Sequence, residues 1–207
     1  KVMGLSSGET KHSEFPTIIP ALGTKFDVGI SSFTITTDRE QQVNMVSYLN
    51  VGSAWGVAAD NPKNFNPSDP CGTTIAVQTG TAQEEYAATL SDECVAAGKS
   101  KITVMPHELQ TDIATKLIGG QYDATLADST VIGYTSAQSG GKIEQLGDTF
   151  ESAPQGIAVA KDDAQLTEAV QKAMQYLMDN GYLTDILATY GADNAALTTA
   201  ELNPSVN

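Results

Sequence analysis

The chain has 207 residues, of which 41% are hydrophobic and 17% charged, so it is long enough to bury the core of one large or two small domains. Its formal net charge is -14, from 25 acidic and 11 basic residues, which argues against a nucleic-acid partner or an anionic membrane surface. No segment approaches the roughly 18 consecutive apolar residues of a transmembrane helix.

Strands and helices are predicted to alternate along the sequence, which is the order of an α/β fold. Before a turn-rich break at residues 61–71, the pattern predicts strands at 2–5, 26–30 and 53–59 and helices at 15–22 and 38–45. After the break it predicts strands at 73–77, 101–105, 122–127, 143–146 and 156–160, and helices at 81–97, 108–118, 129–137, 163–178 and 183–190. The helix at 163–178 carries an apolar stripe made of Leu166, Val170, Ala173, Met174 and Leu177. The polar tail from residue 192 is expected either to cover an edge or to fray.

Cys71 and Cys94 are the only cysteines, and neither has a histidine near it in sequence, so a tetrahedral metal site lacks ligands. Two interpretations of this pair are open. A disulfide would add about 3 kcal/mol to stability and would indicate an oxidising compartment. The alternative is a pair of buried free thiols in a cytosolic protein. The sequence carries no motif that predicts a metal or another cofactor.

Arg39 is the only arginine, and it follows a strand that ends among small hydroxyl residues at positions 31, 32, 34, 36 and 37. Small residues allow a ligand to approach the backbone, and a guanidinium binds a carboxylate through two parallel hydrogen bonds that lysine cannot reproduce. This pattern is typical of an anion clamp. A solvated arginine paired with Asp38 or Glu40 in the first turn of a helix is the alternative.

A second candidate anion site is the segment from Gln78 to Glu84, which leaves a strand, passes through Gly80 and opens a helix. Free amides at a helix start attract carboxylate or phosphate groups, although the same junction is also an ordinary helix cap. Asp128 lies at a similar junction, where a strand ends and a helix begins. Its carboxylate is either an N-cap or an anchor for an ammonium group.

Catalytic arrangements have less support in this sequence. The two histidines, His12 and His107, fall in no nucleophile–base or metal-ligand pattern, and His107 is interpreted as a surface residue at a helix start. Adjacent acids such as Glu84 and Glu85 lie in first helical turns, where they favour the helix dipole. We therefore expect a binding protein and no enzyme.

Together these positions resemble the polar amino-acid family of periplasmic or lipoprotein solute-binding proteins of ABC importers, over nearly the whole chain. The segments that carry the resemblance are IPAL at 19–22, KFDVG at 25–29, TIT with Arg39 at 34–39, VQTGTAQE at 77–84, GQYDA with Asp128 at 120–128, and GIAVAK at 156–161. Each segment alone is weak, whereas the ordered set is specific.

The resemblance implies a set of contacts to an amino-acid ligand. These are Arg39, Thr34, Thr81 and the Ala82 amide for the carboxylate, the Ser32 carbonyl and Asp128 for the ammonium, and Gln78 facing the side-chain pocket. The family often has a hydroxyl residue where Ala82 stands, so only a main-chain contact carries over there.

The resemblance also implies an α/β fold of the two-lobed, periplasmic-binding-protein-like type II class. Lobe 1 would comprise residues 1–52 and 157–207 and lobe 2 residues 53–156, with two hinge crossings near 50–55 and 152–157. Ligand would favour closure because it contacts both lobes, and the closed form would signal to the permease of the ABC transporter.

One departure concerns the beginning of the chain. Family members begin with a strand, a helix and a second strand that contribute aromatic residues around the ligand side chain, and residues 1–5 resemble that second strand. Lobe 1 is therefore expected to lack its first strand and helix and to expose a sheet edge. We expect a mature, trimmed or truncated chain, which leaves the identity of the amino acid open.

The expected function is the extracytoplasmic solute-binding component of an ABC importer, in the periplasm or at the cell surface, with any lipid anchor upstream of residue 1. One alternative is an enzyme like the cyclohexadienyl dehydratases, which resemble this family. Another is a truncated form that binds no ligand and associates with another protein or a second copy through the incomplete lobe.

Overall fold

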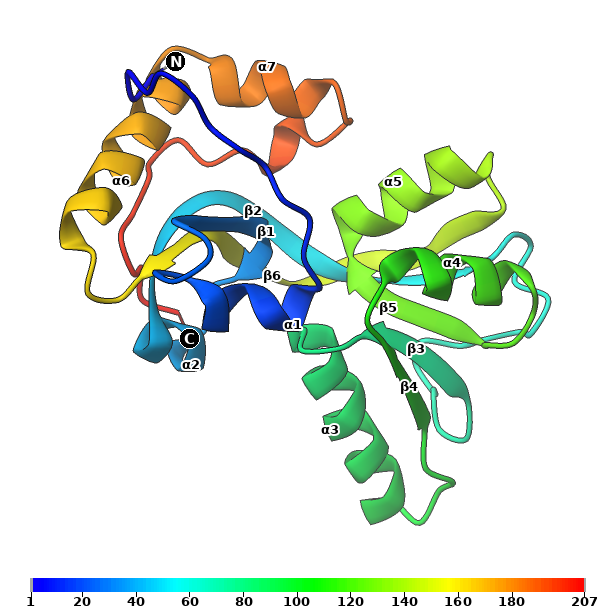
Figure 1. The fold of residues 1–207 in the computed structure, drawn as a ribbon. Helices are drawn as coiled ribbons and strands as arrows, with labels where there is room; N and C mark the ends of the chain where they lie inside the picture. The colour runs from blue at the N-terminus through cyan, green and yellow to red at the C-terminus, as the bar shows by residue number, and fades with distance from the viewer. Residues whose placement is uncertain (1, 207) are drawn as a thin grey trace. The chain divides into compact units, whose positions relative to one another are not determined.

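Two long strands, β2 (Val43–Ala58) and β6 (Ile143–Ala160), each contribute residues to both structural units of this protein. The computed structural model describes residues 2–206. Unit 1 comprises the chain up to Val51 and from Ala153 onwards, and unit 2 runs from Gly52 to Ser152. The chain therefore passes from one unit to the other twice, once within each long strand (Figure 1).

Unit 1 is built around β1 and the outer parts of β2 and β6. Besides these parts of β2 and β6, its elements in chain order are α1 (Phe15–Ile18), the 3₁₀ helix η1 (Ile19–Ala21), β1 (Val28–Thr34), α2 (Thr37–Gln42), α6 (Ala164–Asp179), α7 (Tyr182–Ala188) and the 3₁₀ helix η2 (Asp193–Ala195). Strand β1 pairs antiparallel with β6, with Val28 opposite Val159 and Thr34 opposite Gln155.

The core of unit 1 contains two apolar clusters. In one of them, Val170 and Met174 of α6 and Leu183 of α7 join buried residues of β2 and β6. Leu166 and Leu177 pack against the same cluster, which confirms four of the five residues of the predicted stripe of α6. The other cluster is centred on Phe15, Phe33, Ile35 and Met45, which are all buried. Each fully buried side chain of this size contributes about 1.5 to 3 kcal/mol, so these clusters fix α1 and α6 on the strands.

The polar tail covers β2. Leu49 forms an antiparallel bridge with Ala196, and Val46 forms one with Leu202. The Leu197 amide donates to the Tyr48 carbonyl at 3.1 Å. Of the two outcomes expected for the tail, the structure therefore has the covering one.

Unit 2 is an α/β layer in which strand and helix alternate. Its elements in chain order are β3 (Thr74–Gln78), α3 (Ala82–Ala96), β4 (Thr103–His107), α4 (Gln110–Ile118), β5 (Ala124–Asp128) and α5 (Ser129–Ser139). The strands lie in the order β2-β5-β3-β4, with β3 parallel to both β4 and β5 and with β2 antiparallel to β5. Parallel neighbours need crossover connections, which α3 and α4 supply. Gln78, His107 and Asp128 therefore end their strands at the same edge of the sheet.

A disulfide joins Cys71, in the turn-rich segment before β3, to Cys94 near the end of α3, with 5.6 Å between the two Cα atoms. The predicted disulfide is therefore present, and the alternative of two free thiols is excluded for this structure. Cys94 is buried among the apolar residues of unit 2, so the link also fixes the far end of α3. Among residues 2–206, no helix is both long and apolar enough to cross a bilayer.

The predicted strand at residues 2–5 is wrong. Residues 2 and 3 form a turn, Gly4 has a φ of +68°, and neither Gly4 nor Leu5 is part of a strand. Val2, Met3 and Leu5 are 44%, 38% and 65% exposed. A short apolar run becomes a strand only where a neighbouring strand completes its hydrogen bonds, and these four residues form no such ladder.

Other differences lie at element boundaries. The predicted helix at 15–22 changes from α to 3₁₀ at Ile19, because Pro20 has no amide hydrogen to continue the α-helical ladder. The predicted helix at 38–45 ends at Gln42, because the buried residues from Val43 onwards join β2. The predicted strands at 143–146 and 156–160 are the two ends of one long strand, β6. The polar residues at positions 148, 149, 151 and 152 are exposed, which explains why the apolar pattern is interrupted there.

Candidate functional site

Arg39 is held in unit 1 by its backbone and by its guanidinium. Thr36 caps α2 by accepting a hydrogen bond from the Arg39 amide at 3.3 Å. The Arg39 Nη1 atom donates to the Thr34 carbonyl at 2.7 Å. The guanidinium carbon lies 5.5 Å from the ring centroid of Phe15 and 5.8 Å from that of Phe33. Cation–π contacts of this kind, together with one fixed hydrogen bond, hold the planar group in a defined orientation.

Ser32 and Thr34 lie in an irregular part of β1, just before Arg39. Gly29 lies opposite Ala158 and Phe33 opposite Gly156, so the register between the strands shifts within this stretch. Ser32 has a φ of +50°, a left-handed conformation that is uncommon outside glycine and that typically costs about 1 to 3 kcal/mol. Bulges of this kind turn main-chain groups away from the sheet ladder and are frequent beside binding sites.

The loop from Gln78 to Ala82 is organised by internal hydrogen bonds in unit 2. The Thr81 hydroxyl donates to the Gln78 carbonyl at 2.7 Å and accepts from the Glu84 amide at 3.2 Å. The Glu84 carboxylate accepts from the Gly80 amide at 2.7 Å. The loop therefore has the structure of a capped helix start, in which a carboxylate already binds one loop amide. Ala82 is half-buried and is the first residue of α3.

Gln78 ends β3, and its side chain bonds to the backbone of the neighbouring segment. Its Nε2 atom donates to the Glu108 carbonyl at 3.0 Å. The next residue, Thr79, donates its amide to the His107 carbonyl at 2.9 Å. These two bonds tie the start of the loop to the end of β4. The predicted role of Gln78 in a side-chain pocket stays a prediction.

Asp128 lies at the end of β5 in a buried polar cluster with Gln83 and Ser53. Its Oδ1 atom accepts a hydrogen bond from Gln83 Nε2 at 2.8 Å, and the same nitrogen donates to Ser53 Oγ at 3.0 Å. The exposed fractions of Asp128, Gln83 and Ser53 are 9%, 7% and 9%. The Asp128 side chain makes no capping hydrogen bond to α5, so the N-cap interpretation is wrong as far as the side chain is concerned.

Sequence patterns did not identify Gln83 or Ser53. Gln83 is one position beyond Ala82 on α3, and Ser53 lies directly opposite Asp128 in the antiparallel register of β2 and β5. The signal for Gln83 was a long amide side chain in the first turn of a helix that starts at an anion loop. No local signal links Ser53 to Asp128, because their pairing depends on the fold.

His107 belongs to a different polar cluster, at the end of β4. It is half-buried, and its Nε2 atom lies 2.6 Å from the Tyr122 hydroxyl, while Lys116 Nζ lies 3.5 Å from its Nδ1 atom. Burial lowers the pKa of His107 below 6.5, the Lys116 charge lowers it further, and Asp112 acts in the opposite direction. The interpretation as a surface residue at a helix start is therefore wrong. Across residues 2–206, no group of three or more His, Cys, Asp or Glu side chains is arranged to hold a metal ion.

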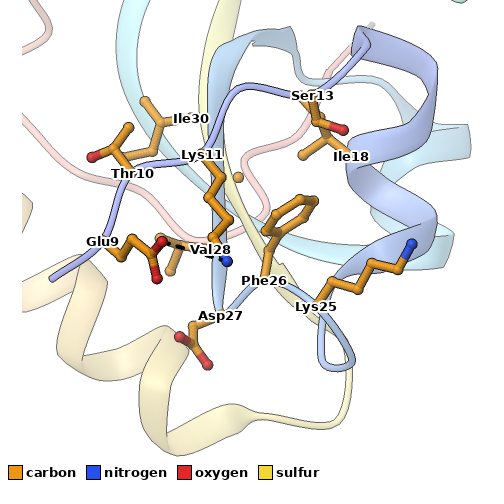
Figure 2. A pocket seen from close by; sticks show the side chains of 11 residues that line it. Glu9, Thr10, Lys11, Ser13, Ile18, Lys25, Phe26, Asp27, Val28 and Ile30 are labelled. Atoms are coloured by element: carbon orange, nitrogen blue, oxygen red, sulfur yellow. Dashed lines mark ion pairs between the residues drawn. The ribbon is translucent and has the colours of Figure 1, made fainter.

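A pocket of about 320 Å³ lies elsewhere in unit 1, between residues 9–13 and the beginning of β1 (Figure 2). Phe26, Val28 and Ile30 contribute apolar side chains to it. The Lys11 side chain extends toward the Glu9 carboxylate, with 3.5 Å between Nζ and Oε1, and both side chains are exposed. None of the candidate ligand-binding residues lines this pocket.

Residues 2–193 match the bacterial extracellular solute-binding proteins, family 3. The chain is similar to the arginine-binding protein ArgT of Corynebacterium glutamicum, with 35% identity over 205 residues that cover 98% of this chain and 66% of the relative. It is also similar to the lysine/arginine/ornithine-binding periplasmic protein of Escherichia coli, with 28% identity over 82% of this chain and 66% of the relative. The chain thus spans about two thirds of the length of each relative.

The fold is also found in solved structures. An ancestral arginine-binding protein bound to arginine superimposes with a TM-score of 0.76 and 29% identity, over 88% of this chain and 79% of that chain. The likeness supports a two-lobed type II α/β fold. The family and these relatives are binding proteins rather than enzymes. This chain belongs to the bacterial extracellular solute-binding proteins of family 3.

Proposed function

We propose that this chain is the solute-binding component of an ABC importer and that its ligand is an amino acid with a cationic side chain, with arginine the first candidate. The observation that carries the proposal is the orientation of Arg39, whose guanidinium is held by the Thr34 carbonyl and by two aromatic rings. A guanidinium fixed in this way is prepared for the planar, bidentate contact that a carboxylate makes.

In this proposal each candidate residue has one role in binding the ligand. Arg39 and the Thr34 amide and hydroxyl bind the carboxylate, and the Ser32 carbonyl accepts from the ammonium. Thr81 and the Ala82 amide also bind the carboxylate, while Asp128 pairs with the ammonium. A 15-residue helix, α3, starts at Ala82 and adds the positive end of its dipole to the carboxylate contacts.

Two observations support a cationic side chain. The relative with 35% identity is named for binding arginine, and the relative with 28% identity is named for binding lysine, arginine and ornithine. The net charge of -14 attracts cationic solutes and repels anionic ones. Gln78 is proposed to face the part of the site that receives this side chain. The extracytoplasmic location and the permease partner of the family are part of the same proposal.

The test is a thermal-shift screen of the purified chain against the twenty standard amino acids at matched concentrations. A ligand that binds only the folded chain raises its melting temperature by mass action. We expect arginine or lysine to give the largest shift, and glutamate and aspartate to give none. A screen in which no amino acid shifts the transition, for a chain that melts cooperatively, would contradict the proposal and favour the non-binding alternative.

A further inference from the structure

Gln83 connects three elements of unit 2 through one buried amide group. It lies in the first turn of α3, and its Nε2 atom donates to Asp128 Oδ1 on β5 at 2.8 Å and to Ser53 Oγ on β2 at 3.0 Å. An amide nitrogen carries two hydrogens, so these two bonds use both of its donors. Gln83 is 7% exposed, which places the contact out of bulk water.

The geometry of the strands explains why one side chain reaches both partners. Ser53 and Asp128 are opposite each other in the antiparallel pair of β2 and β5. Directly opposite residues point to the same face of a sheet, with about 4.5 to 5.5 Å between their Cβ atoms. A single amide above that face can therefore bind the hydroxyl and the carboxylate together, which restricts the rotation of the Asp128 side chain.

A neutral donor is the appropriate partner for a carboxylate that must bind a cation. A lysine or arginine at position 83 would satisfy Asp128 Oδ1 and would also neutralise its charge. An amide satisfies the oxygen and leaves the negative charge in place. Orientation and charge are the two properties that a bound ammonium requires of its partner carboxylate.

We propose that Gln83 is a positioning residue that holds the Asp128 carboxylate in the orientation that binds the ammonium of the ligand. This rests on the proposed function, because it takes Asp128 as the ammonium partner. Gln83 follows Thr81 and Ala82 on α3 by one or two residues, so the same rigid first turn carries the proposed carboxylate contacts and the support for the ammonium contact. The distance between the two contacts is then fixed by the helix, which selects ligands that carry an ammonium next to a carboxylate.

The experiment compares two ligands and measures their dissociation constants by isothermal titration calorimetry. L-Arginine has the ammonium, and 5-guanidinopentanoate is the same molecule without it. Gln83→Met keeps the length of the side chain and removes the amide, and Gln83→Asn keeps the amide and shortens the reach. Gln138→Met, at an exposed glutamine of α5 in the same unit, is the matched control.

We expect Gln83→Met to weaken L-arginine binding about ten- to hundred-fold and 5-guanidinopentanoate binding less than about three-fold, because only the first ligand uses Asp128. Gln83→Asn should show the same selective loss. If circular dichroism shows that the methionine variant is unfolded, the asparagine variant is used in its place. Gln138→Met should bind both ligands like the wild type. A merely structural role for Gln83 would weaken both ligands equally.

The outcomes separate this inference from the function on which it rests. The positioning role would be overturned if the wild type binds L-arginine and the Gln83 variants lose affinity equally for both ligands, or lose none. Either result would leave the proposed function intact. Absence of binding by the folded wild type would overturn the proposed function and, with it, this inference.

Discussion

The Arg39 Nη1 atom donates a hydrogen bond to the Thr34 carbonyl at 2.7 Å, so the only arginine of the chain is fixed to the irregular end of β1 that precedes it. The contact joins a side chain of α2 to the backbone of a strand five residues earlier. The phenyl rings of Phe15 and Phe33 stack on each other with 4.8 Å between their centroids, and both lie within 6 Å of the guanidinium. Contacts within the protein itself therefore orient Arg39.

Replacing Arg39 with lysine tests this orientation. Lysine keeps the charge and loses the planar fork, so Arg39→Lys should weaken amino-acid binding by about 1.5 to 3 kcal/mol in calorimetric titration. Asp38→Asn is the matched control, because it changes a charge at an exposed neighbouring position of the same helix and should leave the affinity nearly unchanged. Equal affinity of the lysine variant and the wild type would refute the clamp.

Removing the disulfide should lower stability. In a chain-entropy estimate, closing the loop between Cys71 and Cys94 contributes about 3 kcal/mol to the free energy of unfolding, so the double variant Cys71→Ser/Cys94→Ser should lose about that amount in urea denaturation. Adding a reductant should destabilise the wild type to the same level and should not affect the double variant. A double variant as stable as the oxidised wild type would contradict this account of the link.

Gly52 is a position where a side chain does not fit. A Cβ atom there would lie 2.4 Å from Thr149 Cγ2 and 2.7 Å from the Phe150 carbonyl oxygen, which is backbone and cannot rotate away. Gly52→Ala should therefore lower the free energy of unfolding by about 1 to 3 kcal/mol. Gly133 lies in α5 with no atom within 4 Å of such a Cβ, so Gly133→Ala should instead stabilise by about 0.5 to 1 kcal/mol. Two variants of equal stability would show that the crowding at Gly52 relaxes without cost.

His107 makes part of the stability depend on pH. Because burial and Lys116 lower its pKa below 6.5 in the folded chain, the unfolded chain binds a proton more readily. The contribution of His107 to the free energy of unfolding is therefore fully present above pH 6.5. It is lost as the pH falls below 6.5 and passes the lower pKa that His107 has in the folded chain. Urea denaturation at pH 7.5 and 5.0 should show a larger drop for the wild type than for His107→Asn. The other histidine, His12, is present in both proteins, so its effect cancels in the comparison. Equal drops in the free energy of unfolding for the wild type and His107→Asn would contradict this role of His107.

The sequence predicts the helices and strands of unit 2 well, because its parallel strands and crossover helices have strong local signals. Thr81 caps α3, and buried residues fill β3 and β5. It predicts unit 1 less well. The apolar run at residues 2–5 has the composition of a strand, but these residues do not pair with another strand. Strand pairing depends on the fold and cannot be read from the run itself. Likewise, β6 is continuous through polar residues whose pattern indicates a break.

The candidate site was predictable only in part. Arg39, Thr81 and Asp128 lie at ends of elements, where local sequence signals exist. The contact of Arg39 with Phe15 joins residues 24 positions apart, and the bonds of Gln83 reach residues 30 and 45 positions away. Such partners follow from the packing of separate elements, so no sequence pattern reveals them. The same holds for His107, whose partner Tyr122 belongs to the segment after α4.

The most direct test of the account is isothermal titration calorimetry of the wild-type chain with L-arginine and with agmatine, which is arginine without its carboxylate. We predict saturable binding of L-arginine and binding of agmatine weaker by at least about ten-fold, because Arg39 has no carboxylate to bind in agmatine. Equal affinities for the two ligands, or no binding of L-arginine or any other amino acid by the folded chain, would contradict the proposal that Arg39 binds the carboxylate of an amino acid.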